Sequence, residues 1–342
     1  TGGFSLSIEY VNFGTAGVKV SRMALGLGFR GQFDRDDAKS VVLQALDSGI
    51  NLIDCANVYG FMDDRRNIGS SEEVLGQALK GRRDDVVITS KVFSPIGEGP
   101  NDQGPSRFHV IREIERSLKR LQTDHVDVYI FHGVDDMSLF EEQFRTMETL
   151  IQQGKIRYVG VSNFQAWQVV QALQVQRRIN AQPLIAVQNP YSLMNRTQED
   201  ELFPMIRETG VGLMAYSPLG VGLLSGTYKH GEVPDDSTLW GSRRQGQIAT
   251  YMRGKAGRVI TAVNDVAHEL GVSMPQVAMA WVMSHSEVTV AISGADTVEQ
   301  ITDVAGALEL TLPDEMIAKL DNVSYGMRAV LDGADDDFED DD

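Results

Sequence analysis

Val126-Asp-Val-Tyr-Ile-Phe-His132 is a short, almost wholly apolar stretch rich in β-branched and aromatic residues. This pattern is typical of a strand that is covered on both faces. An amphipathic segment follows at Phe140–Gln153, and a second apolar run follows at Tyr158–Asn163. The order strand, helix, strand predicts a parallel βαβ unit.

The same alternation continues outward in both directions, from residue 23 to residue 310. The predicted strands are Met23–Gly28, Asn51–Asn57, Val86–Val92, Val126–His132, Tyr158–Asn163, Leu184–Asn189, Gly212–Ser217 and Val288–Ser293. The predicted helices between and after them are Asp36–Leu46, Ser71–Leu79, Val110–Leu121, Phe140–Gln153, Ala166–Arg177, Asp200–Glu208 and Val298–Leu308. Eight such units predict an α/β fold, a closed (β/α)8 TIM barrel with its chemistry at the carboxyl ends of the strands.

Three segments fall outside this eightfold plan, and we expect them to be additions to the barrel. They are an N-terminal hairpin at Ile8–Val20 and two helices at Met274–His285 and Asp314–Asn322. Residues 1–328 are therefore predicted to form a single barrel domain. Acidic residues crowd the segment 329–342, and like charges at this density repel one another, so we expect a flexible tail without chemistry.

Composition excludes several classes of function. A net charge of -17 without a local basic patch argues against a nucleic-acid partner. The longest apolar run, 211–224, is broken by Pro218 and several glycines, so no membrane span is expected. The single Cys55 allows no intrachain disulfide, and the N-terminus has no signal-peptide pattern, which together favour a cytoplasmic protein. Oligomeric state stays undecided.

Gly26-Leu-Gly28-Phe-Arg-Gly31 matches the G-x-G-x-x-G motif of dinucleotide-binding folds, with Asp54 at a suitable distance for a ribose-binding acid. In that fold the third glycine belongs to the start of the helix, whereas here 32–34 still precede the helical pattern. Eight uniform units also exceed what such a domain needs. The barrel is therefore the favoured fold.

Titratable residues close three successive strands: Asp54, Lys91 and His132. Each alone has an ordinary structural explanation, but a barrel brings all three to the same mouth. Tyr59 follows Asp54 by five residues. A lysine ammonium lowers the pKa of a nearby tyrosine, which makes the phenol a usable general acid–base. In this hypothesis Asp54 keeps Lys91 charged, and His132 positions the carbonyl oxygen that Tyr59 protonates.

These strand ends resemble the Asp-Tyr-Lys-His tetrad of the aldo-keto reductases. Further motifs similar to that family are Lys155-Ile-Arg-Tyr-Val-Gly-Val-Ser162-Asn163-Phe, Val-Gln188-Asn-Pro-Tyr191, Tyr216-Ser217-Pro218-Leu219 and Ser293-Gly294-Ala295-Asp296-Thr-Val-Glu299-Gln300. The resemblance covers Phe13 to Ser324, and in motif style it lies nearest to the branch of bacterial reductases and potassium-channel β subunits. It implies hydride transfer between NAD(P)(H) and a carbonyl or alcohol, with no metal.

The resemblance also implies where the cofactor binds. Ser162, Asn163 and Gln188 would hold the nicotinamide carboxamide, and Tyr216 would stack on its ring. The remaining predicted contacts are Ser217, Pro218, Leu219, Gly220, Gly222, Leu223 and Ser225 at the pyrophosphate, and Arg243, Ser293, Gly294, Ala295, Asp296, Glu299 and Gln300 elsewhere. Buried amides at strand ends need polar partners, which a carboxamide would supply. Thr227 and Asp296 replace residues usual in the family. A carboxylate near the ribose would repel the 2′-phosphate of NADP(H), which mildly favours NAD(H). NADP(H) stays open, because Arg243 or Arg244 is able to bind that phosphate instead.

The substrate is a small carbonyl or alcohol compound, and Phe29, Phe61 and Arg65 are its predicted contacts. The segment 61–68 is longer than usual for the family, so we expect it to border the substrate pocket. Two other functions stay open. One is a cofactor-binding regulatory subunit, as in potassium-channel β subunits, although those differ at the tetrad histidine. The other is a barrel that uses Lys91 as a nucleophile, which is disfavoured because Asp54 should keep Lys91 protonated.

Overall fold

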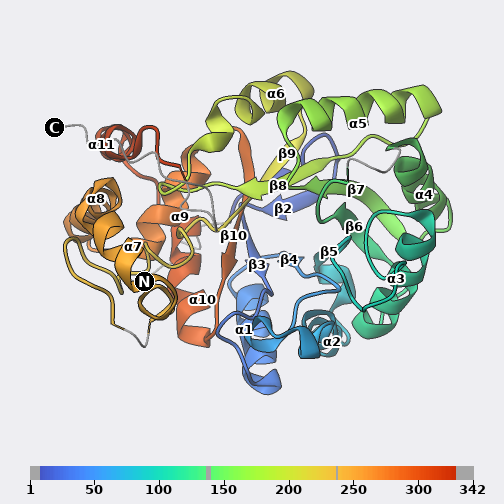
Figure 1. Cartoon of the computed structure of the whole chain (residues 1–342), viewed down its shortest axis with the longest axis horizontal. Helices are drawn as coiled ribbons and strands as arrows, with labels where there is room; N and C mark the ends of the chain where they lie inside the picture. Colours follow the sequence, from blue (N-terminus) through green and yellow to red (C-terminus); the bar gives the residue numbers. More distant parts are fainter. Residues whose placement is uncertain (1–7, 136–139, 236–237, 329–342) are drawn as a thin grey trace, which may run out of the picture.

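The computed structural model describes residues 8–135, 140–235 and 238–328, and its centre is a closed eight-stranded barrel (Figure 1). All the strands are parallel, and each neighbours the next in sequence, with β10 closing the ring against β3. The strands are β3 Met23–Gly26, β4 Leu52–Asp54, β5 Val87–Val92, β6 Val126–Phe131, β7 Ile156–Ser162, β8 Ala186–Pro190, β9 Gly212–Tyr216 and β10 Val288–Gly294. The predicted TIM barrel is confirmed.

A helix follows each barrel strand and packs outside the ring (Figure 1). These helices are α1 Arg35–Asp47, α2 Ser70–Ala78, α3 Arg107–Leu121, α4 Phe140–Gln152, α5 Ala166–Ile179, α6 Leu202–Thr209, α9 Met274–Ser284 and α10 Val298–Ala305. Helix α1 begins after its N-cap Asp34, whose side chain accepts from the backbone N–H groups of Asp36 and Asp37. Gly31 therefore lies outside the helix, which is the arrangement that argued against a dinucleotide-binding motif.

The expected additions to the barrel need correction. The helix predicted as an extra, α9, packs against β10 and α10 and takes the place of the helix after β9. Two helices that the sequence analysis did not assign, α7 Leu239–Arg253 and α8 Lys255–Leu270, lie farther out with α11 Asp314–Ser324 (Figure 1). Glycines such as Gly241 and Gly246 interrupt the apolar pattern of α7, which explains the omission.

The N-terminal hairpin, β1 Tyr10–Asn12 and β2 Lys19–Ser21, closes the amino end of the barrel. Phe13 and Val20 are fully buried against inward-facing residues such as Leu52 and Met214. Gly14 has a φ of +56°, and a Cβ there would lie 2.1 Å from the carbonyl oxygen of Ile185. Only glycine fits this turn. The barrel interior is thus sealed on one side and open only at the carboxyl ends of its strands.

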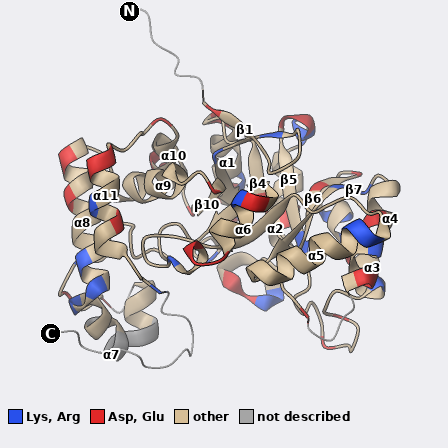
Figure 2. Cartoon of the chain, turned by 90° about the horizontal axis from the view of Figure 1, so that it is seen from above, with Lys and Arg blue, Asp and Glu red and all other residues tan. Residues whose placement is uncertain are grey.

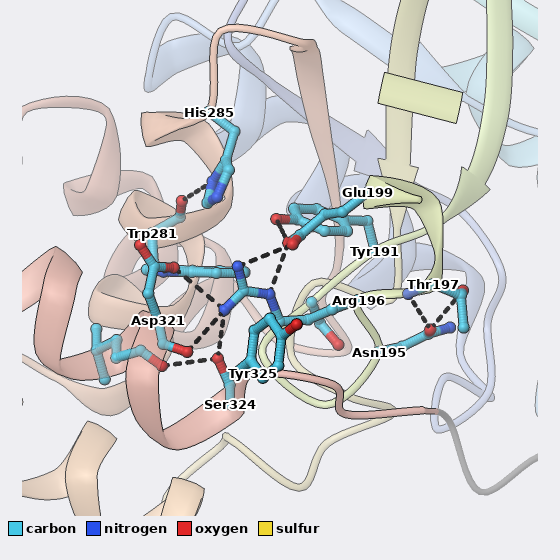
Figure 3. Close-up of polar contacts among 12 residues, drawn as sticks. Tyr191, Asn195, Arg196, Thr197, Glu199, Trp281, His285, Asp321, Ser324 and Tyr325 are labelled. Atoms are coloured by element: carbon cyan, nitrogen blue, oxygen red, sulfur yellow. Dashed lines mark hydrogen bonds and ion pairs between the residues drawn. The ribbon is translucent and has the colours of Figure 1, made fainter. Parts of the chain in front are cut away.

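Helix α11 is tied to the loop after β8 by a partly buried polar cluster (Figure 3). The Arg196 guanidinium donates to Glu199 and to the Ser324 hydroxyl, and it lies 5.1 Å from the ring centroid of Trp281. Tyr191, the residue after β8, donates to Glu199 over 2.6 Å. Because β8 carries Gln188, this cluster fixes one strand end of the site through a C-terminal helix.

Figure 2 shows charged residues of both signs along the outer helices, for example α3, α8 and α11. Within the described ranges, every helix is too short or too polar to cross a bilayer.

Candidate functional site

The centre of the site is a buried ion pair between two adjacent barrel strands. Lys91 Nζ lies 2.6 Å from Asp54 Oδ2, and the Lys91 side chain is 0% exposed. Asp54 Oδ1 accepts from the Thr89 hydroxyl and from Gln188 Nε2 over 3.0 Å. Lys91 also donates to the carbonyl oxygen of Cys55 over 3.0 Å. A buried pair of charges is stable only when further hydrogen bonds satisfy both partners, and these contacts supply them.

Tyr59 lies over this ion pair and beside His132. Lys91 Nζ is 4.6 Å from the centroid of the Tyr59 ring, and the Tyr59 hydroxyl is 3.3 Å from His132 Nε2. The Ser71 hydroxyl binds the carbonyl oxygen of Ala56, and Ser71 N–H donates to the carbonyl oxygen of Tyr59, so the start of α2 fixes the loop. The structure therefore brings together the four residues predicted from the strand ends.

The protonation states of this group differ in part from the expectation. Burial raises the pKa of Tyr59 above its usual value, although Lys91 opposes the shift. The expected net lowering of this pKa by Lys91 is therefore wrong for the protein without ligand. Burial disfavours the charge of Lys91, but Asp54 and Tyr59 outweigh it and raise the pKa of the ammonium group. Burial, with the charge of Lys91, lowers the pKa of His132 to about 3. At neutral pH the group holds a protonated phenol, an ammonium and a neutral imidazole.

The amides predicted to await a carboxamide already have partners in the protein. Asn163 Nδ2 donates to the carbonyl oxygen of His132, and Asn163 Oδ1 accepts from the Tyr216 hydroxyl, both over 2.9 Å. The Ser162 hydroxyl donates to the carbonyl oxygen of Gln188 over 2.9 Å. The expectation of unsatisfied strand-end groups is thus wrong, because neighbouring strand ends satisfy one another.

These contacts also fix which way each amide faces. A carboxylate and a backbone carbonyl only accept hydrogen bonds, so Gln188 must turn its NH2 group toward Asp54, and Asn163 must turn its NH2 group toward His132. The carbonyl oxygen Oε1 of Gln188 is left as an acceptor at the edge of a cavity that Gln188 lines.

This cavity measures about 820 Å³ and runs from Asp54, Tyr59 and His132 to the first turns of α10. Among the predicted residues, its lining includes Phe29, Ser162, Asn163, Gln188, Tyr216, Ser217, Pro218, Leu219, Gly222, Ser225, Thr227, Ser293, Gly294, Ala295, Asp296, Glu299 and Gln300. Gly222 has a φ of +88° and nothing within 4 Å of where a Cβ would stand, and its N–H group donates to the carbonyl oxygen of Leu219 over 3.1 Å.

Several predicted residues lie elsewhere. Leu223 belongs to the core, and Gly220 packs against Met194, where a Cβ would lie 2.7 Å from its side chain. Phe61 stacks beneath Phe29, with ring centroids 4.9 Å apart, and does not line the cavity. Arg65 donates to the carbonyl oxygen of Pro95. The side chain of Arg243 lies outside the described residues.

Asp296 lines the cavity, and its carboxylate also bonds to the loop after β3. Its Oδ1 accepts from Gly31 N–H over 3.3 Å, and its backbone carbonyl accepts from Gln32 Nε2 over 2.8 Å. Gln300 Oε1 accepts from Asp296 N–H over 2.8 Å, so its side chain stabilises the same turn. Asp296 therefore connects the loop after β10 to the loop after β3, which the sequence did not predict.

A family model for the aldo/keto reductase family matches residues 13–324, nearly the whole chain. The chain belongs to the aldo/keto reductase family. It is similar to an uncharacterized oxidoreductase, YrpG, of Bacillus subtilis (strain 168), with 36% identity over 327 residues, 93% of this chain and 97% of the relative. It is also similar to a probable voltage-gated potassium channel subunit beta of Oryza sativa subsp. japonica (35% over 324 residues, 92% and 96%) and to another of Arabidopsis thaliana (34% over 309 residues, 89% and 92%).

Family membership and the oxidoreductase relative support an oxidoreductase. In this aldo/keto reductase, several residues that line the cavity were missed by the sequence analysis, namely Arg30, Val221, Leu239, Pro275, Asp303 and Val304. Arg30 was hidden inside the rejected glycine motif, and its position directly after a strand end was the available signal. Within the described ranges, no cluster of three or more His, Cys, Asp or Glu side chains is arranged to hold a metal.

Proposed function

We propose that this reductase transfers hydride between NAD(P)(H) and the carbon of an aldehyde, ketone or sugar, with Tyr59 as the general acid–base. The observation that carries the proposal is the position of Tyr59, whose hydroxyl lies 3.3 Å from His132 Nε2 and whose ring lies over the ammonium group of a buried Lys91–Asp54 ion pair. A phenol, an ammonium and a neutral imidazole that meet at the mouth of a cavity are equipped to move one proton.

The four residues divide the work as follows. The raised pKa of Tyr59 keeps its proton available for the carbonyl oxygen in the direction of reduction, and the same oxygen accepts a proton in oxidation. Lys91 stabilises the phenolate that forms as the proton leaves, and Asp54 keeps Lys91 charged and in place. His132, neutral at working pH, holds the substrate oxygen by a hydrogen bond. A bound nicotinamide would supply the hydride that adds to the carbon as the C=O pair moves to oxygen.

The cavity residues fit such a cofactor. Gln188 Oε1 is oriented to accept from a carboxamide NH2, Tyr216 offers its ring, and the lack of a side chain at Gly222 leaves room for phosphate oxygens. A cavity of about 820 Å³ lies within the usual range for ligands of this kind. A carboxylate at Asp296 repels a 2′-phosphate and mildly favours NAD(H) over NADP(H).

A second candidate is a regulatory subunit that binds cofactor and acts through a protein partner. Two relatives, at 35% and 34% identity, carry the name of a potassium channel β subunit. A stoichiometric membrane partner in a pull-down, with no turnover across aldehydes, ketones and sugars, would favour it. The Lys91 nucleophile alternative loses support, because the raised pKa of Lys91 keeps its amine protonated.

The test begins with fluorescence titration of the wild-type protein with NADH and NADPH, followed by turnover across a panel of aldehydes, ketones and sugars. In Tyr59→Phe we expect an unchanged cofactor Kd and a loss of kcat of about 10²- to 10⁴-fold, the usual contribution of a general acid–base. Tyr129→Phe is the matched control, since its buried hydroxyl has no partner among the described residues. Full activity in Tyr59→Phe would refute the assignment.

A further inference from the structure

Arg30 is a charged residue at the reacting end of the cavity for which the proposed function has no use. It follows β3 in the loop that leads to α1, and it lines the same cavity as Tyr59, His132 and Tyr216. Burial raises the pKa of both Tyr59 and Tyr216, and the charge of Arg30 acts on both in the opposite direction. Arg30 thus shares the lining of the cavity with the two phenols, and its charge acts on both.

The loop that carries Arg30 is fixed on both sides. Before it, Phe29 adopts a left-handed backbone with a φ of +50° and stacks on Phe61 at 4.9 Å with an interplanar angle of 4°. After it, Gly31 and Gln32 both bind Asp296, and Met62 N–H donates to the carbonyl oxygen of Gln32 over 3.1 Å. A non-glycine residue in this conformation is strained and persists only where its surroundings hold it. Contacts on both sides of Arg30 thus fix the backbone of this loop.

Arg30 makes no hydrogen bond and no ion pair with any residue that the structure describes. Nearby arginines do: Arg35 pairs with Glu73 at 2.8 Å, Arg66 pairs with Asp64 at 2.6 Å, and Arg65 donates to a backbone carbonyl. The charge is also not neutralised from within the site.

The acidic groups nearest in the lining already have partners: Asp54 forms an ion pair with Lys91, and Asp296 accepts from Gly31 N–H. His132 is neutral. The other acidic residues of the lining, Glu299 and Asp303, belong to α10 at the far end of the cavity. At the reacting end, the guanidinium of Arg30 is therefore a positive charge that no acidic side chain of the lining neutralises.

We propose that Arg30 binds an anionic group, a carboxylate or a phosphate, on the carbonyl substrate. This inference rests on the proposed function, and it narrows the substrate class to aldehydes, ketones or sugars that carry a negative charge. A guanidinium offers a planar fork of donors that matches both oxyanions, and a hydrogen bond to a charged group is stronger than one between neutral groups. The proposed function places the cofactor pyrophosphate instead at the loop after β9, where Gly222 has no side chain to obstruct it.

The test compares pairs of ligands that differ in one charge. Isothermal titration calorimetry measures 4-carboxybenzaldehyde against methyl 4-formylbenzoate, and glyceraldehyde 3-phosphate against glyceraldehyde. Each ligand is added to the free protein and to its complex with oxidised cofactor, and kcat/KM with reduced cofactor is measured for the same pairs. The variants are Arg30→Met and, as a matched control, Arg82→Met, whose guanidinium pairs with Asp47 and Asp85 on the outside of the barrel.

We expect the wild type and Arg82→Met to prefer at least one anionic ligand over its neutral partner. Arg30→Met should lose about tenfold to a hundredfold of that preference, measured as the ratio of the anionic to the neutral ligand within each variant, while the Kd of the cofactor stays unchanged. The pair that loses preference identifies carboxylate or phosphate.

An unchanged preference in Arg30→Met, or a wild type that favours the neutral ligands, would overturn the inference while turnover upholds the proposed function. A weakened cofactor Kd with unchanged ligand preference would overturn it too, and would place Arg30 at the cofactor phosphates. Failure of the proposed function looks different, because neither cofactor then supports turnover of any ligand, charged or neutral.

Discussion

The ion pair between Lys91 and Asp54 predicts a strong and measurable coupling between two substitutions. Lys91→Met removes the 2.6 Å contact with Asp54 and the 3.0 Å bond to Cys55, and it leaves a carboxylate that is 5% exposed with only Thr89 and Gln188 as donors. Breaking a buried pair on one side costs about 3–5 kcal/mol, because the remaining charge has no counterpart. Asp54→Asn leaves the ammonium in the same position, and we expect a similar loss.

The double variant Asp54→Asn/Lys91→Met removes both charges, so it should be less destabilised than the sum of the two single variants, by about 3 kcal/mol. Urea unfolding at pH 7, followed by circular dichroism with the slope compared between variants, gives each free energy of unfolding. Additivity of the two losses within about 0.5 kcal/mol would refute the argument that the charges depend on each other. The experiment needs no substrate, so it tests the architecture of the site separately from its chemistry.

Three further predictions concern single positions. Between pH 6.5 and the lowered His132 pKa of about 3, His132 is protonated in the unfolded chain but not in the folded one. As the pH falls through this range, the free energy of unfolding of the wild type should therefore decrease by up to about 1.4 kcal/mol per pH unit more than that of His132→Gln. Melting temperatures measured across the pH range check this. Gly14→Ala should destabilise the protein by more than about 2 kcal/mol, because its Cβ would lie 2.1 Å from a backbone oxygen, whereas Gly17→Ala, with nothing within 4 Å, should change little; equal melting temperatures would contradict this. Asn57 Nδ2 donates over 3.1 Å to Glu113, which is 1% exposed, and Asn57 belongs to the loop that carries Tyr59; Asn57→Ala should therefore lower kcat more than it weakens cofactor binding, and an intact kcat would exclude this positioning role.

The fold was predictable because buried parallel strands leave a plain mark in the sequence. Runs such as Gly212–Tyr216 and Val126–Phe131 are almost wholly apolar, and every predicted barrel strand is present within a few residues of its predicted bounds. The outer helices were harder. Glycines interrupt the apolar pattern of α7, but α8 buries Val259, Val263 and Val266 at a spacing of three and four residues, a helical signal that the sequence analysis overlooked. Helix α9 was predicted as a helix but treated as an addition to the barrel. The sequence does not show which of the helices after β9 packs against β10.

The candidate site was predictable where one residue ends one strand. Asp54, Lys91 and His132 lie at the same mouth because parallel strands share their direction. Their protonation states were not predictable, because burial outweighs the neighbouring ammonium at Tyr59 and the sequence gives no measure of burial. The same limit applies to Asn163, whose partners come from strands more than thirty residues away.

Asp296 and Arg30 illustrate why a motif alone misplaced the charges of this site. Asp296 matches a position that contacts the adenosine in the family, yet its carboxylate and its carbonyl hold Gly31 and Gln32. The acid after the last strand therefore fixes the loop after the first strand, and that loop directs Arg30 toward the reacting end. A substitution of Asp296 intended to change cofactor preference would also release the loop of Arg30. Cofactor and substrate selectivity should consequently change together in Asp296→Ala, and a change in cofactor preference alone would show that the two loops are independent.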